Sequence, residues 1–189
     1  QTQMRIDEEV IGRDSSSNSE IKKIGVCTLP NEQYINVDTF TTQNDKGDFK
    51  IETVRNNGVQ PSPDRPMVFV VKKNASSLKN LIKYFTETTT ILADEYVIQS
   101  DNRKIINNLP LLLIDDEADQ ASPNTNAISN DDGELDPKSI NRKIRELLLL
   151  FNQRVYIGYT ATPFANIFIH HDQDHSIYGQ DLFPDRKST

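Results

Sequence analysis

The chain of 189 residues lacks several features, and each absence excludes a class of protein. A single cysteine, Cys27, excludes an internal disulfide framework and suits a reducing compartment. There is no signal peptide and no apolar run near the roughly 18 residues that a membrane helix needs. A net charge of −7 and a pI near 5.0 argue against a protein that coats nucleic acid, which would be basic. We therefore expect a cytoplasmic protein with no membrane partner.

The dipeptide Gly-Lys is also missing. The seven glycines are followed by Arg, Val, Asp, Val, Glu, Tyr and Gln. The phosphate loop G-x-x-x-x-G-K-[ST], which cradles the phosphates of a bound nucleotide, is therefore absent. We expect the isolated chain to hydrolyse no ATP and to bind it weakly at best.

Two segments stand out among what is present. LLLIDDEAD, residues 111–119, is an apolar run that ends in a cluster of carboxylates. YIGYTATP, residues 156–163, is a second apolar run that ends in a turn of small residues. P-loop nucleoside triphosphatases use a strand-end acid to hold Mg²⁺ and orient the attacking water. The pair of segments predicts the core of an ATP-driven nucleic-acid motor.

Within the acidic segment, position in the strand predicts the role of each acid. Asp116 would hold Mg²⁺, directly or through water, and Glu117 would be the catalytic acid that polarises the attacking water. Asp119 could reach the turn Thr160-Ala161-Thr162, whose two hydroxyls suit a coupling element. The purely structural alternative for the acidic segment is a solvated turn. The alternative for Thr160-Ala161-Thr162 is an ordinary strand-to-helix turn with Thr as the N-cap.

The remaining pattern alternates strands with helices. Runs at 67–73, 111–114 and 154–160 predict strands buried on both faces, as in a parallel sheet. Apolar residues at helical spacing predict a helix at 3–11 with Met4, Val10 and Ile11 inward, and two more helices. The second helix is capped by Ser76 or Ser77, and the third is capped by Asp136 with Pro137 at its first position. The apolar faces of these two helices are expected to be Leu78, Leu81, Ile82 and Phe85, and Ile140, Ile144, Leu147, Leu148 and Phe151.

This order of elements predicts an α/β fold with a three-layer, RecA-like parallel sheet flanked by helices. We expect an incomplete domain over residues 1–169, with a polar insertion at about 30–65. Residues 170–189 are expected to be a flexible tail or linker. The tail contains His170, His171 and His175, which resemble metal ligands but have no predicted rigid element to hold them.

Several blocks of the sequence resemble the Z-one domain, a helicase-like bacterial domain associated with endonucleases of DNA restriction and phage-defence loci. The blocks are QTQMRIDEEVIG, FVVKKNASSLKNLIKYF, LLLIDDEADQAS and GYTATPFANIFI. The resemblance implies a superfamily 2 motor that uses ATP and Mg²⁺ and acts on DNA in the bacterial cytoplasm, although the residues do not distinguish DNA from RNA. It also implies two partners within the same polypeptide, an upstream phosphate-loop segment and a second RecA-like domain.

The nucleic-acid path is expected at two places. Lys72, Lys73 and Asn74 leave a predicted strand at its carboxyl end, where such motors contact the phosphate backbone. A solvated basic loop is the alternative for these three residues. The resemblance places Gln1, Thr2 and Arg5 near the same path.

Two other functions stay open at this stage. The first is a DNA-binding or regulatory module that keeps the fold without catalysis. The second is a metal-dependent nuclease built on Asp115, Asp116, Glu117 and Asp119. Pro63-Asp64 and Lys72 have the spacing of a common nuclease motif, Pro-Asp followed by acid-x-Lys. The motif is incomplete, because no acid lies two residues before Lys72.

Overall fold

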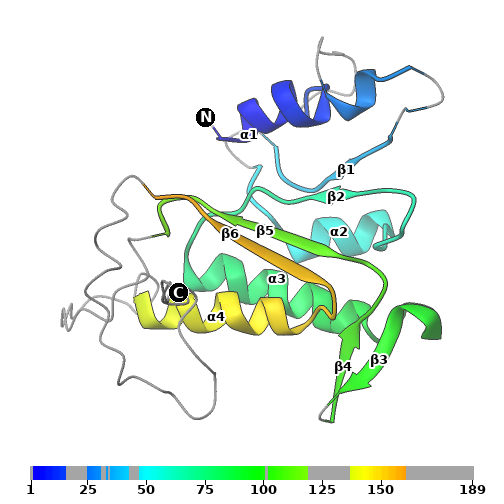
Figure 1. Cartoon of the computed structure of the whole chain (residues 1–189), viewed down its shortest axis with the longest axis vertical. Helices are drawn as coiled ribbons and strands as arrows, with labels where there is room; N and C mark the ends of the chain where they lie inside the picture. The colour runs from blue at the N-terminus through cyan, green and yellow to red at the C-terminus, as the bar shows by residue number, and fades with distance from the viewer. Residues whose placement is uncertain are drawn as a thin grey trace, which may run out of the picture. The chain divides into compact units, whose positions relative to one another are not determined.

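Figure 1 shows the computed structural model of the chain. The structure describes residues 2–15, 25–30, 33, 35–42, 47–100, 102–118 and 137–160. Contacts divide the chain into two compact units. Unit 1 comprises Gln1–Lys72 with Thr90–Leu92, and unit 2 comprises Lys73–Thr89 with Ala93–Thr189. Each unit has its own buried apolar core.

Unit 1 begins with the helix that the sequence predicts. A short α-helix, α1 (Thr2–Arg5), continues as a π-helical stretch, η1 (Ile6–Ile11). Gly12 ends it in the left-handed conformation, with φ 87°, and its N–H donates to the Asp7 carbonyl at 2.8 Å. Glycine suits this position because it has no Cβ to clash at positive φ.

The predicted inward face of this helix is partly wrong. Ile11 is buried, but Met4 and Val10 are 42% and 49% exposed, and Gln3 and Asp7 are buried instead. The buried polar pair is tolerated because Gln3 Nε2 donates to the Asp7 carboxylate at 2.8 Å. Apolar spacing alone does not reveal such a pair.

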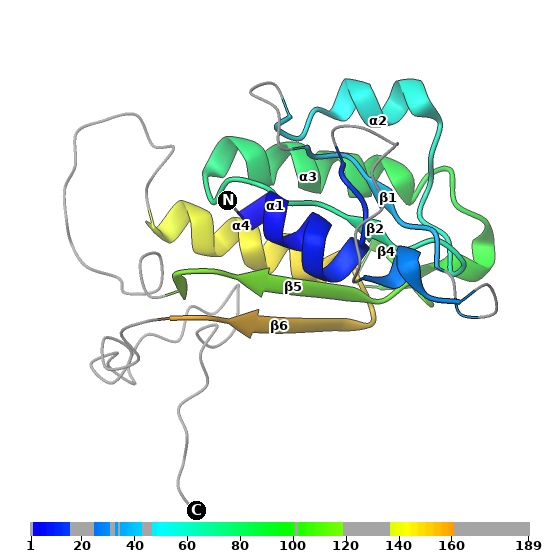
Figure 2. The ribbon, with the colours of Figure 1, turned by 90° about the horizontal axis from the view of Figure 1, so that it is seen from above.

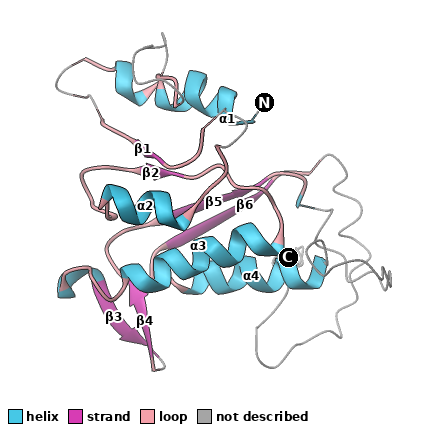
Figure 3. Ribbon diagram, turned by 180° about the vertical axis from the view of Figure 1, so that it is seen from behind, coloured by secondary structure: helices cyan, strands magenta, loops and turns pink. Residues whose placement is uncertain are grey.

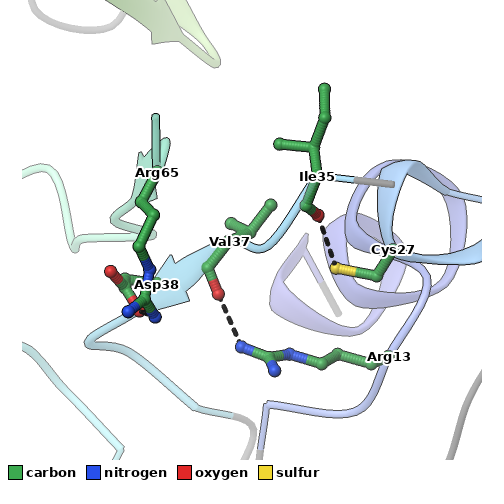
Figure 4. A network of polar contacts seen from close by, with 6 residues as sticks. All are labelled: Arg13, Cys27, Ile35, Val37, Asp38 and Arg65. Carbon is green, nitrogen blue, oxygen red and sulfur yellow. Dashed lines mark hydrogen bonds and ion pairs between the residues drawn. The ribbon is translucent and has the colours of Figure 1, made fainter. Parts of the chain in front are cut away.

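The rest of unit 1 contains short elements. They are η2 (Val26–Thr28), β1 (Asp38–Thr39), α2 (Ile51–Asn57) and β2 (Met67–Val68), and β1 pairs with β2 in parallel. Polar contacts hold this region together (Figure 4). Arg13 donates to the Val37 carbonyl, Cys27 Sγ donates to the Ile35 carbonyl at 3.2 Å, and Arg65 forms an ion pair with Asp38.

The prediction of a buried strand over 67–73 is wrong in its length and in its burial. Its assigned part is β2, whose two residues are half-buried. After β2 the backbone forms a hydrogen bond with a side chain in place of a neighbouring strand, because Val70 N donates to Thr41 Oγ1 at 2.9 Å. A run of β-branched residues therefore produces neither full burial nor a long ladder of backbone hydrogen bonds by itself, because strand propensity depends on the surrounding packing.

Unit 2 is built on two helices that lie side by side, α3 (Ala75–Thr88) and α4 (Pro137–Leu149) (Figure 3). The predicted apolar faces of both helices are confirmed, because all nine named residues are buried. The predicted cap at Ser76 or Ser77 is wrong. Asn74 is the N-cap, and its Oδ1 accepts from Ser77 N at 2.8 Å. Pro137 begins α4 as predicted, while Asp136 lies outside the described residues.

Between the helices lies a segment for which the sequence made no prediction. A 3-10 turn, η3 (Asp94–Tyr96), leads into a hairpin of β3 (Val97–Ser100) and β4 (Arg103–Ile106). Asn102 has φ 62° in the two-residue loop of the hairpin, a conformation that Asn tolerates well. The end of β4 then meets Phe151, where Ile106 N donates to the Leu150 carbonyl at 2.7 Å.

The last two strands form a parallel pair, β5 (Leu111–Asp115) and β6 (Arg154–Gly158). Their arrows point the same way in Figure 2. One face packs on the helices, because Leu111, Leu113 and Tyr156 contact the core of Leu78, Ile140, Ile144 and Leu148.

The other face of this pair is exposed, so the prediction of strands buried on both faces is wrong for β5 and β6. Leu112 and Ile114 are 57% and 55% exposed, and their cross-strand partners Val155 and Ile157 are exposed as well. Apolar composition on both faces therefore coexists here with burial of only one.

The fold is α/β with parallel strand pairs, as predicted at the level of fold class. Within the described ranges each sheet has two strands, so no large parallel sheet is seen. The predicted tail at 170–189 lies outside those ranges. None of the helices described is long and apolar enough to cross a lipid bilayer.

Candidate active site at the carboxyl end of β5 and β6

The described parts of the acidic segment, 111–118, and of the segment that begins at Tyr156, 156–160, meet at one edge. Asp115, the last residue of β5, pairs with Gly158, the last residue of β6. Tyr159 N donates to the Asp115 carbonyl at 2.8 Å, and Ala118 N donates to the Tyr159 carbonyl at 2.8 Å. The turn at residues 115–118, here called the acidic turn, is thus bonded to the residue that precedes Thr160.

Of the predicted catalytic acids, both are exposed on this turn. Asp116 Oδ1 accepts a hydrogen bond from Glu117 N at 3.1 Å. Glu117 has φ 55°, the left-handed region that costs a non-glycine residue about 1–3 kcal/mol. Such backbone strain persists only where the surrounding structure enforces it, and it gathers at functional sites.

Asp115, to which the motor prediction gave no role, is the buried acid at the start of this turn. It is 6% exposed, and both of its carboxylate oxygens are engaged. Lys73 Nζ lies 2.8 Å from Oδ1, and the Tyr156 hydroxyl donates to Oδ2 at 2.8 Å. One oxygen of this buried carboxylate is therefore in an ion pair and the other accepts a hydrogen bond, which offsets the cost of burial.

Tyr156 responds to this environment. Burial, followed by the hydrogen bond to Asp115 and its negative charge, raises the pKa of the Tyr156 phenol well above its ordinary value near 10. The phenol therefore stays protonated as a donor to Asp115 throughout the physiological range. Tyr156 begins the segment 156–163, but no role was predicted for it. Its place opposite Leu113 in a parallel pair, on the helix-packed face, is the signal that could have indicated one.

Lys73 makes a second contact on the acidic turn. Its Nζ donates to the Glu117 carbonyl at 3.0 Å, in addition to its ion pair with Asp115. The next residue, Asn74, caps α3. The two adjacent residues thus fix the start of the helix and reach the acidic turn.

The other predicted site residues are distributed between the units. Lys72 belongs to unit 1, where its exposed Nζ lies 2.7 Å from Asp48 Oδ2. Thr2 and Arg5 are exposed on α1. Thr160 is half-buried directly after Tyr159. Gln1, Asp119, Ala161 and Thr162 lie outside the described residues, as do the histidines of the tail.

The side chains of the acidic turn fit a Mg²⁺ site completed by water and substrate better than a site formed by three or more protein ligands. Mg²⁺ is commonly held by one or two carboxylates together with water and substrate phosphates, and the exposed Asp116 provides such a carboxylate. Among the residues described, no three or more His, Cys, Asp and Glu side chains are grouped as a metal site would need.

Comparisons with models of known families, with curated proteins and with solved structures find no match to this chain.

Proposed function

We propose that this chain carries the magnesium-binding strand and the coupling turn of an ATP-dependent, DNA-acting, helicase-like motor of bacterial restriction or phage defence. The meeting of the acidic turn with the strand that leads into Thr160 carries the proposal. Two backbone hydrogen bonds join these segments, which are distant in sequence, at the carboxyl edge of a parallel pair. Ligands of open α/β sheets bind at this edge.

The arrangement of unit 2 supports a finer fold within this proposal. A parallel strand pair with two helices on one face is what part of a three-layer, RecA-like domain would contain. The exposed, apolar second face of β5 and β6 is expected in such a domain when its other layer is supplied by further chain.

Each acid has a distinct role in the proposed reaction. Asp116, exposed at the strand end, would hold Mg²⁺, which when bound neutralises charge on the phosphates. Glu117 would orient the attacking water. Asp115 would be a structural acid, because its two oxygens are taken by Lys73 and Tyr156.

The residues of this chain do not supply the phosphate loop that ATP requires, since no Gly-Lys pair is present. The proposal therefore needs a phosphate-binding loop and a second RecA-like domain from elsewhere in the gene product. Without them we expect residues 1–189 to show no turnover.

The test is ATP hydrolysis by the gene product that contains residues 1–189, with and without DNA. We expect DNA to stimulate turnover, and Glu117→Gln to lower kcat by about 10²- to 10⁴-fold while nucleotide binding survives. Glu146→Gln, which changes an exposed acid on α4, is the matched control and should leave turnover unchanged.

Two results would overturn the motor proposal. DNA binding without hydrolysis would favour a regulatory module that keeps the fold. Mg²⁺- or Mn²⁺-dependent nicking of DNA without ATP would favour the nuclease alternative, which the engagement of Asp115 by Lys73 and Tyr156 makes less favourable.

A further inference from the structure

The Lys73 ammonium contacts two groups of the acidic turn, the Asp115 carboxylate and the Glu117 carbonyl. Its ammonium lies 2.8 Å from the Asp115 carboxylate and donates to the Glu117 carbonyl at 3.0 Å. An ammonium has three donors and no acceptor, so it can bridge two acceptors of this kind at once. The bridge spans Asp116 and therefore encloses both proposed catalytic acids.

The turn that Lys73 bridges is strained. Glu117 has φ 55°, and the contact of its carbonyl with Lys73 offsets part of the cost of that conformation. On the opposite side, the Tyr156 hydroxyl fixes the second oxygen of Asp115 at 2.8 Å. The carboxylate cannot rotate without breaking one of these contacts.

Lys73 itself is well anchored. Asn74, its neighbour, accepts from Ser77 N and so fixes the chain at the first turn of α3. The Lys73 side chain is 25% exposed, whereas the Lys72 side chain is 68% exposed. The two adjacent lysines are thus in different settings, one inside the acidic turn of unit 2 and one on the surface of unit 1.

We propose that Lys73 is a positioning residue for Asp116 and Glu117, acting through the Asp115 carboxylate and the Glu117 carbonyl, rather than a contact to the nucleic-acid backbone. This inference rests on the proposed function for its effect on turnover. Its effect on the geometry of the turn is independent of any activity.

The first experiment compares Lys73→Met with Lys73→Arg in the gene product. Lys73→Met should lower kcat about 10- to 100-fold, because small misplacements of catalytic groups have effects of this size. The KM for ATP should change less than about twofold, as expected when ground-state binding is untouched. Lys73→Arg keeps the charge and several donors, and should restore kcat to within about threefold of the wild type.

Binding to DNA distinguishes the two roles of Lys73. A lost phosphate contact reduces the slope of log Kd against log salt by about one, whereas a lost positioning contact leaves it unchanged. We expect no change of slope for Lys73→Met. An unchanged kcat, or a slope reduced by about one, would overturn the inference.

The second experiment uses amide hydrogen exchange in the chain of residues 1–189. Lys73→Met should speed exchange at Ala118 and Tyr159, whose N–H groups bond the acidic turn to β6, and leave Leu147 in α4 unchanged. Unchanged exchange at Ala118 and Tyr159 overturns the inference whatever the turnover. A wild-type gene product without turnover overturns the proposed function alone.

Discussion

Among the described residues, each unit of the chain buries one aspartate, and the two are held in different ways. Asp7 in unit 1 is 0% exposed and accepts from Gln3 Nε2 and from the backbone and hydroxyl of Ser15, at 2.7–3.0 Å. Asp115 in unit 2 is paired with the Lys73 ammonium and the Tyr156 hydroxyl.

The partners also differ in their distance along the chain. Gln3 and Ser15 are four and eight residues from Asp7, so they tie one helix to the loop that follows it. Tyr156 is 41 residues from Asp115, and Lys73 lies before α3. Local partners stabilise a helix end, whereas distant partners place a carboxylate relative to several elements at once. We therefore expect Asp7 to act on folding alone, and Asp115 to be a structural acid that also places the acidic turn.

The largest effect on stability is expected for Asp7→Ala. It leaves the buried donor of Gln3 and the half-buried donors of Ser15 without their acceptor, at a cost of about 3 kcal/mol in the free energy of unfolding. Glu9→Ala, at an exposed position of the same helix, should change stability by less than about 0.5 kcal/mol. Urea unfolding measures both. Equal effects would remove the distinction between buried and exposed acids on this helix.

The two faces of β5 provide the next comparison. Leu113→Ala removes a side chain that packs on the helix core and should cost about 2 kcal/mol. Leu112, on the outer face, is 57% exposed, so Leu112→Ala should lower the free energy of unfolding by less than about 0.5 kcal/mol. A cost for Leu112→Ala as large as that of Leu113→Ala, measured in residues 1–189, would mean that the outer face is packed in solution.

Asp115→Asn should lower the free energy of unfolding only modestly, but it should also lower ATP turnover. The amide keeps one acceptor but loses the charge that attracts Lys73, which should cost about 1.5 kcal/mol. In the gene product we expect this change to lower ATP turnover, while Asp7→Asn leaves kcat unchanged once the protein is folded. A loss of kcat in Asp7→Asn equal to that in Asp115→Asn would break the assignment of the two acids to different roles.

The smallest effect is a change in alkaline stability. The pKa of Tyr156 is raised in the folded protein, so its contribution to stability is complete below the unfolded value near 10 and is lost as pH rises above it. The unfolding free energy of the wild type should therefore fall more steeply above pH 10 than that of Tyr156→Phe. Identical slopes in denaturant unfolding would show that the phenol does not donate to Asp115 in solution.

The sequence predicted some parts of this structure well. Apolar residues at helical spacing located α3 and α4, because a buried helical face repeats with the period of its backbone. Continuous apolar runs located β5 and β6. The acidic turn lies beside the strand that leads to Thr160, as expected when the carboxyl ends of parallel strands meet at one edge of a sheet. The class α/β was therefore accessible from pattern alone.

Other parts depend on contacts that no local pattern records. The burial of Gln3 and Asp7 depends on their hydrogen bond, and the cap of α3 fell on Asn74 two residues before the predicted serines. The role of Asp115 was missed because its partners, Lys73 and Tyr156, come from opposite sides of it in the chain. Burial of both strand faces was predicted from composition, which cannot tell whether a covering layer is present.

The most direct test of the account is a double-mutant cycle between Lys73 and Glu117, measured by single-turnover ATP hydrolysis in the gene product with DNA. If Lys73 acts only by positioning the acidic turn, Lys73→Met should lower the rate strongly in the wild type. In the Glu117→Gln protein, the same change should lower the residual rate by a smaller factor, because only the placement of Asp116 is then still affected. An equal loss in both backgrounds, or no hydrolysis in the wild type, would contradict the account.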